Sequence, residues 1–61
     1  MKKYTLYKNG VYLKEASTIK ELGEWLENII GGSLYQGLLA LRDDWTPEPH
    51  SQLSGYTIKT S

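Results

Sequence analysis

The dipeptide Asn9-Gly10 constrains the fold of this 61-residue chain more than any other feature. It separates residues 3–8 from residues 11–16, and apolar and polar side chains alternate in both segments, as in β-strands. A two-residue Asn-Gly loop favours a type I′ turn, because both central residues of that turn need positive φ. We therefore expect a β-hairpin in which Lys8 lies opposite Val11.

The two-residue turn also predicts the register of the hairpin. Counting outward from it gives the pairs Tyr7–Tyr12, Leu6–Leu13, Thr5–Lys14 and Tyr4–Glu15. One face of the hairpin is then expected to pack on a helix, and it carries Tyr4, Leu6, Val11 and Leu13. The other face is expected to meet solvent or a partner, and it carries Lys3, Thr5, Tyr7, Tyr12 and Lys14.

The clearest helix of the chain is predicted at residues 18–30. Thr18 and Glu21 have the spacing of a capping box, which satisfies free N–H groups at a helix start. Gly31-Gly32 predicts the end of the helix, because glycine adopts the left-handed conformation without penalty. Trp25 would cover the edge of the core. An apolar stripe at helical spacing is formed by Ile19, Leu22, Leu26 and Ile29.

Residues 33–42 predict a second helix, again with capping-box spacing, at Ser33 and Gln36. Its expected apolar stripe consists of Leu34, Leu38 and Leu41, with Tyr35 and Leu39 beside it. Residues 38–41 alone would also suit a short buried strand. A glycine inside each helix, Gly23 and Gly37, costs about 1 kcal/mol relative to alanine and is a candidate point of close helix crossing.

Proline, serine and glycine in residues 43–55 predict a loop, and the alternating run 56–60 predicts a third strand beside the hairpin. Tyr56 and Ile58 would face the core, with Thr57 and Lys59 on the opposite side. The fold class is therefore expected to be α+β, with the element order ββααβ. A three-stranded antiparallel sheet packs on one or two helices in a single domain of residues 1–61.

The composition argues against several classes of protein. The chain has no cysteine, so neither a disulfide nor a thiolate metal site is expected. No segment approaches the roughly 20 apolar residues of a membrane span, and no apolar signal-peptide run follows Lys2 and Lys3. We therefore expect a soluble, cytoplasmic protein without a membrane partner.

The net charge of the chain is zero, but the charges are segregated. Residues 1–20 form a basic segment with a net charge of +4, and residues 21–48 form an acidic segment with a net charge of −5.

Three short stretches follow a known pattern: Tyr7-Lys8-Asn9-Gly10, then Ser17 to Leu22, then Gly55-Tyr56-Thr57-Ile58. In this order the chain resembles the small nuclease-associated modular DNA-binding repeat of phage and homing endonucleases. The resemblance implies a helix-turn-helix whose second helix docks on DNA. The positions that it makes candidates for DNA contact are Ser33, Tyr35, Gln36 and Arg42.

A second route to nucleic acid is the solvent-facing side of the predicted sheet. Lysines there, Lys3, Lys14 and Lys59, would neutralise phosphates, and Tyr7 and Tyr12 would stack on unpaired bases. The alternative is an ordinary solvated sheet face with a cross-strand tyrosine pair.

The acidic segment favours a protein partner instead. Glu21 and Glu24, with Glu27, form an acidic ridge along the first helix, and Trp45 in the loop would be an exposed anchor. The alternatives are a solvated helix face and a tryptophan that folds back as a lid over the core.

No constellation of catalytic or metal-binding residues is recognisable. His50 is the single histidine, and the carboxylates near it, Asp43, Asp44 and Glu48, lack regular spacing. We therefore expect a non-enzymatic protein without catalytic residues, metal, cofactor or small-molecule substrate. The leading hypothesis is a small nucleic-acid-binding or regulatory module. The alternative is a phage-type accessory or inhibitor protein that binds a host protein through the acidic helix face or the Trp45 loop.

Overall fold

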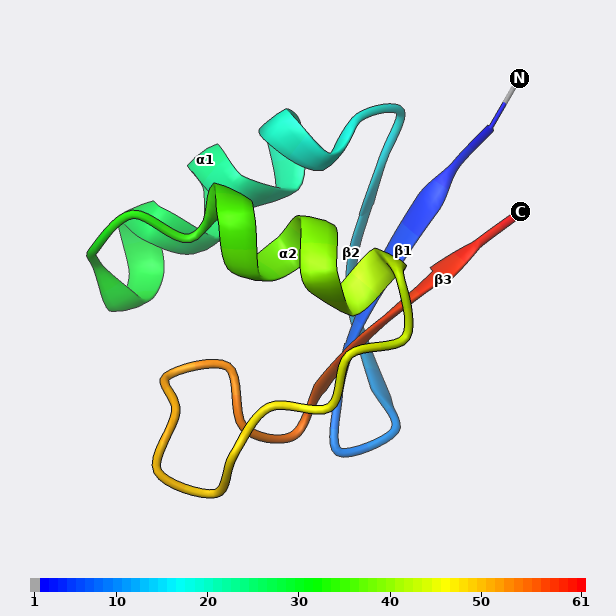
Figure 1. Cartoon of the computed structure of the whole chain (residues 1–61). Coiled ribbons are helices and arrows are strands. Elements are labelled where there is room, and N and C mark those ends of the chain that lie inside the picture. The colour runs from blue at the N-terminus through cyan, green and yellow to red at the C-terminus, as the bar shows by residue number, and fades with distance from the viewer. Residues whose placement is uncertain (1) are drawn as a thin grey trace.

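The computed structural model describes residues 2–61, so Met1 of the expected domain lies outside the described residues. Its elements are β1 (Tyr4–Lys8), β2 (Val11–Ala16), α1 (Ile19–Ile30), α2 (Tyr35–Arg42) and β3 (Tyr56–Thr60). The strands form one antiparallel sheet in the order β2-β1-β3, and both helices lie on one of its faces (Figure 1). The predicted α+β class and ββααβ order are confirmed, and the alternative of a strand at residues 38–41 is wrong.

The hairpin turn forms as the Asn-Gly pair predicts. Asn9 and Gly10 both have positive φ, 51° and 82°, and the pairs Lys8–Val11 and Tyr7–Tyr12 next to the turn are confirmed. The backbone N–H of Asn9 also donates to the carbonyl oxygen of Gly55 at 2.8 Å. The tip of the hairpin is therefore tied to the start of β3.

Beyond Tyr7 the hairpin departs from the predicted register. The pairing shifts by one residue, so Leu6 lies opposite Lys14, Thr5 opposite Glu15, and Tyr4 opposite Ala16. Leu13 is the extra residue of a β-bulge. The predicted pairs Leu6–Leu13, Thr5–Lys14 and Tyr4–Glu15 are therefore wrong.

The bulge affects which side chains at the end of β2 are buried. Leu13 packs against the core, and Ala16 at the end of β2 is buried. In the regular register Glu15 would lie opposite Tyr4, and Ala16 would not pair with it. Val11, which was expected on the helix-packed face, is 63% exposed, because it lies next to the turn at the far end of the sheet.

Helix α1 begins and ends close to where the sequence predicts. The Oγ1 atom of Thr18 accepts a hydrogen bond from the N–H of Glu21 at 3.1 Å, and Gly31, with φ of 79°, ends the helix. Trp25 is half-buried against the core, as expected. The last apolar position differs: Ile29 is 59% exposed, and Ile30 packs against the core in its place.

Helix α2 begins two residues later than predicted, and Leu34 is its N-cap. The capping box expected from Ser33 and Gln36 is wrong, because the N-cap makes no hydrogen bond through its side chain. The acceptor at this helix start comes from α1: the N–H of Leu34 donates to Oε2 of Glu27 at 3.1 Å. The expected stripe of Leu34, Leu38 and Leu41 is buried, which confirms the face of the helix.

The C-terminus of α2 is closed by a Schellman motif. The N–H of Trp45 donates to the carbonyl of Ala40 at 2.9 Å, and the N–H of Asp44 donates to that of Leu41 at 3.1 Å. Asp44 occupies the left-handed position, with φ of 69°, where glycine is more usual. The motif turns the chain away from the helix and into the loop.

The core lies between the sheet and the two helices and also receives one loop residue. Leu53, in the middle of the predicted loop, is only 4% exposed. A Cβ atom on Gly37 would collide with its side chain, so Gly37 faces the loop and does not mark the helix crossing. Gly23 does face α2, as expected, with the Cα of Tyr35 3.7 Å from the position of an added Cβ. The buried hydrophobic residues are Leu6, Ala16, Ile19, Leu22, Leu26, Leu34, Leu38, Leu41, Leu53, Tyr56 and Ile58.

Candidate functional site

The outer sheet face, defined as the face opposite the helices, carries a row of three neighbouring side chains. The Nζ atom of Lys59 lies 5.3 Å from the ring centroid of Tyr7. The rings of Tyr7 and Tyr12 meet edge to face, with centroids 6.4 Å apart and planes at 85°. The row crosses all three strands, since Lys59 is on β3, Tyr7 on β1 and Tyr12 on β2.

The bulge changes the charge of the outer sheet face. It pairs Glu15 with Thr5 and so moves Glu15 onto this face, while Lys14 lies opposite the buried Leu6. The Nζ atom of Lys3 is 3.7 Å from Oε1 of Glu15, which partly neutralises it. Lys14, expected to join Lys3 and Lys59 on this face, therefore lies away from them.

Of the residues that the resemblance makes candidates for DNA contact, Ser33 precedes α2 and the other three are spread along it. Tyr35 and Gln36 are in its first turn and Arg42 is its last residue, and all four candidates are exposed. The Nε atom of Arg42 lies 3.3 Å from Oδ1 of Asp43. This contact with the Asp43 carboxylate raises the pKa of Arg42 and engages the single arginine of the helix.

The loop after α2 leaves its tryptophan outside the core. Trp45 is 43% exposed, so it does not act as a buried lid. His50 and Glu48, also in this loop, form an exposed pair with Nε2 and Oε2 2.9 Å apart. It is Leu53 that attaches the loop to the core, and Trp45 remains free for a contact.

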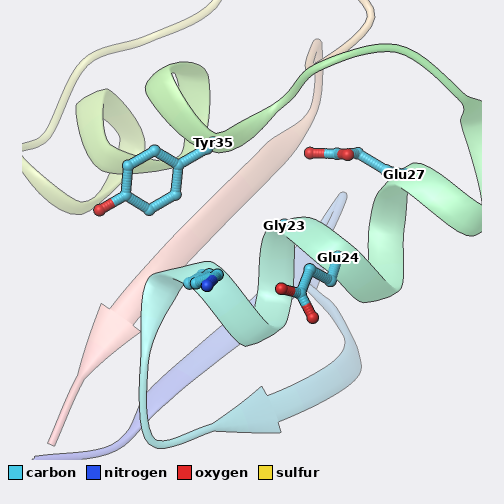
Figure 2. A pocket seen from close by; sticks show the side chains of 5 residues that line it. Gly23, Glu24, Glu27 and Tyr35 are labelled. Atoms are coloured by element: carbon cyan, nitrogen blue, oxygen red, sulfur yellow. The ribbon is translucent and has the colours of Figure 1, made fainter.

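A groove lies between the two helices. It encloses about 390 Å³ and is lined by Lys20, Gly23, Glu24 and Glu27 of α1 and by Tyr35 of α2. Figure 2 shows the ring of Tyr35 on one side and Glu24 on the other, with the backbone of Gly23 between them. We call the hollow lined by these five residues the helix groove.

Charges are distributed unevenly along the helix groove. Lys20 lies at the N-terminal end of the lining segment of α1, and Glu24 and Glu27 follow one and two turns later. Glu27 extends toward the start of α2 (Figure 2), where it accepts the hydrogen bond of Leu34. Within residues 2–61, the carboxylate of Glu24 takes part in no ion pair.

Sequence reasoning named three members of the helix groove but assigned them to different sites, Glu24 and Glu27 to the acidic ridge and Tyr35 to the DNA-contact candidates. It missed Lys20 and Gly23 as lining residues. Their positions, with spacings of three or four residues on α1, carry the signal that they share one helix face. Only the packing of α2 shows that Tyr35 faces them.

The structure gives no sign of a metal centre or a membrane span in the part of the chain that it describes. Residues 2–61 contain no group of three or more His, Cys, Asp or Glu side chains that could hold a metal ion. None of the described helices has the length and apolar character to cross a membrane.

The chain matches no family model, and no similar protein was found among curated proteins or solved structures. The resemblance to the nuclease-associated repeat therefore stays an expectation.

Proposed function

We propose that the protein is a non-enzymatic interaction module that binds a segment of a partner protein in the helix groove. The observation that carries this proposal is the hollow itself, about 390 Å³ between two helices. Its floor is formed at Gly23, which has no side chain, and its walls are an aromatic ring, Tyr35, and a carboxylate, Glu24. Hollows with apolar walls and a few polar groups are the usual binding sites of proteins.

Charge favours a protein partner over nucleic acid. Binding of nucleic acid depends on lysines and arginines that neutralise phosphates. On the outer sheet face Lys3 is paired with Glu15, and on α2 Arg42 is paired with Asp43. The helix groove, by contrast, is lined by the carboxylate of Glu24, whose negative charge would repel the phosphates of nucleic acid. A role as a phage-type accessory or inhibitor protein in the cytoplasm belongs to this proposal and rests on the sequence alone.

A second candidate function, binding of single-stranded nucleic acid, is favoured by one specific observation. Lys59, Tyr7 and Tyr12 form a continuous row on the outer sheet face. Tyrosines beside a lysine can stack on bases while the ammonium group contacts a phosphate. This candidate uses the opposite side of the molecule from the helix groove, so the two can be tested independently.

The experiment is an amide-shift titration of the isotope-labelled protein by NMR. One series uses pooled random peptides, and the other uses mixed-sequence single-stranded and duplex DNA at low and raised salt. Shifts at Gly23, Glu24 and Tyr35 with peptides are expected. Salt-sensitive shifts at Tyr7, Tyr12 and Lys59 with DNA, and none with peptides, would reject the helix groove and favour the second candidate.

A further inference from the structure

We propose that the segment bound in the helix groove is basic, and that one arginine or lysine side chain of the partner is its anchor. The alkyl part of this side chain lies over Gly23 and against the ring of Tyr35, and its cationic end reaches the carboxylate of Glu24. This inference rests on the proposed function, because it names the chemistry of the partner for the same groove.

Gly23 provides the floor on which a long side chain can lie. A Cβ atom at this position would meet Leu38, Tyr35 and Glu27 at 3.7–3.8 Å, which is ordinary van der Waals contact. The packing of α1 on α2 therefore does not require a glycine. A glycine inside a helix nevertheless costs about 1 kcal/mol relative to alanine. A residue that breaks a local rule without a packing reason is often functional, and Gly23 is buried at the bottom of the helix groove, beside the backbone of Tyr35.

Tyr35 provides the wall that suits a cationic side chain. It is 41% exposed at the start of α2, and its backbone is held next to Gly23. The face of a tyrosine ring attracts ammonium and guanidinium groups. The alkyl part of arginine or lysine can cover an apolar surface while its charged end stays in water.

The carboxylates give the helix groove its preference for positive charge. Glu24 lines the groove without an intramolecular ion pair in residues 2–61, and Glu27 stands one turn further along. Glu21, one turn before Glu24 on the helix, adds to the acidic ridge but does not line the groove. Lys20 at the other end repels a cation, so the basic anchor is expected at the end of Glu24 and Glu27.

The test is selection from a random peptide library displayed on yeast, with the labelled protein as bait. Selected peptides are synthesised, mapped by amide shifts, and remade with each basic residue replaced by norleucine, which keeps an unbranched alkyl side chain but removes the charge. We expect the selected peptides to contain arginine or lysine beside apolar residues. The norleucine replacement is expected to weaken binding about fivefold or more, because it removes an exposed charge contact and the cation–π contact made by the same group.

Variants of the protein provide the matched controls. Glu24→Gln is expected to weaken binding of the selected peptides, whereas Glu21→Gln, the same change outside the groove, is expected to leave it unchanged. Gly23→Ala fills part of the floor and is expected to weaken binding although it stabilises the helix. Lys20→Ala is expected to strengthen binding.

The outcomes separate this inference from the function on which it rests. Peptides that shift Gly23 and Tyr35 but bind equally well with norleucine, or to Glu24→Gln, would overturn the basic anchor and leave the groove as a binding site. Failure of every selected peptide to shift these residues would overturn both.

Discussion

The Oε2 atom of Glu27 in α1 lies 3.1 Å from the backbone nitrogen of Leu34 and accepts its hydrogen bond at the start of α2. The first N–H groups of a helix have no partner within it, and the positive end of the helix dipole favours a carboxylate there. One side chain thus caps the second helix from the first and also lines the helix groove. The contact joins the start of α2, next to Tyr35, to α1.

Replacement of Glu27 by alanine is therefore expected to destabilise the fold. It removes a charged acceptor from a half-buried N–H group, which should lower the free energy of unfolding by about 1–2 kcal/mol. Urea unfolding followed by tryptophan fluorescence measures the change. Glu24→Ala, the control on the same helix, is expected to stay within about 0.5 kcal/mol of the native protein. Equal losses in the two variants would show that the contact with Leu34 is not what stabilises α2.

The two glycines within helices are expected to respond in opposite directions to the same substitution. Gly23→Ala adds a methyl group in ordinary contact, so the gain in helix propensity should raise stability by about 0.5–1 kcal/mol. Gly37→Ala drives a methyl group into the buried Leu53, and the strain should outweigh the gain and leave a net loss of roughly 1 kcal/mol. Thermal unfolding of both variants, compared by their midpoints, checks the prediction. A stabilised Gly37→Ala would mean that Leu53 can move aside freely.

The left-handed residue that ends α2 offers a stabilising substitution. Asp44 has φ of 69° in the Schellman motif, and glycine takes this conformation without steric cost. We expect Asp44→Gly to raise the free energy of unfolding by about 0.5–1 kcal/mol. Asp43→Gly, at a neighbouring residue with φ of −92°, has no such strain to relieve and should not stabilise the protein. Chemical denaturation of the pair gives a direct comparison.

Leu53 is expected to be the residue that attaches the loop between α2 and β3 to the core. Its replacement by alanine should cost about 2–4 kcal/mol, the usual range for a buried leucine. Thr46→Ala, at an exposed position of the same loop, should change stability by less than about 0.5 kcal/mol. Limited proteolysis is a second measurement, because a released loop becomes a site of cleavage in Leu53→Ala. Resistance of that variant to protease would contradict the role given to Leu53.

The features that could be predicted from the sequence are those decided by a few neighbouring residues. Asn9-Gly10 determines the turn, Thr18 caps α1, and Gly31 ends it, each through its own backbone conformation or side chain. The alternation of residues 56–60 likewise predicted that Tyr56 and Ile58 face the core.

The features that could not be predicted depend on packing between distant parts of the chain. The bulge at Leu13 brings the buried Ala16 opposite Tyr4, although the turn next to it forms as expected. The cap of α2 comes from Glu27, seven residues before Leu34, and outweighs the local capping signal at Ser33. The helix groove has the same origin, since Tyr35 and Gly23 meet only when α2 packs on α1.

The central position of β1 has a consequence for how the chain folds. Its pairing with β2 closes a two-residue turn, whereas its pairing with β3 joins Lys8 to Tyr56, 48 positions apart. Closing the longer loop costs more chain entropy, and such non-local pairings slow folding. The hairpin is therefore expected to form first and to present β1 as the template on which β3 docks last. In a refolding experiment, amide protons that bridge β1 and β3 should gain protection after those that bridge β1 and β2.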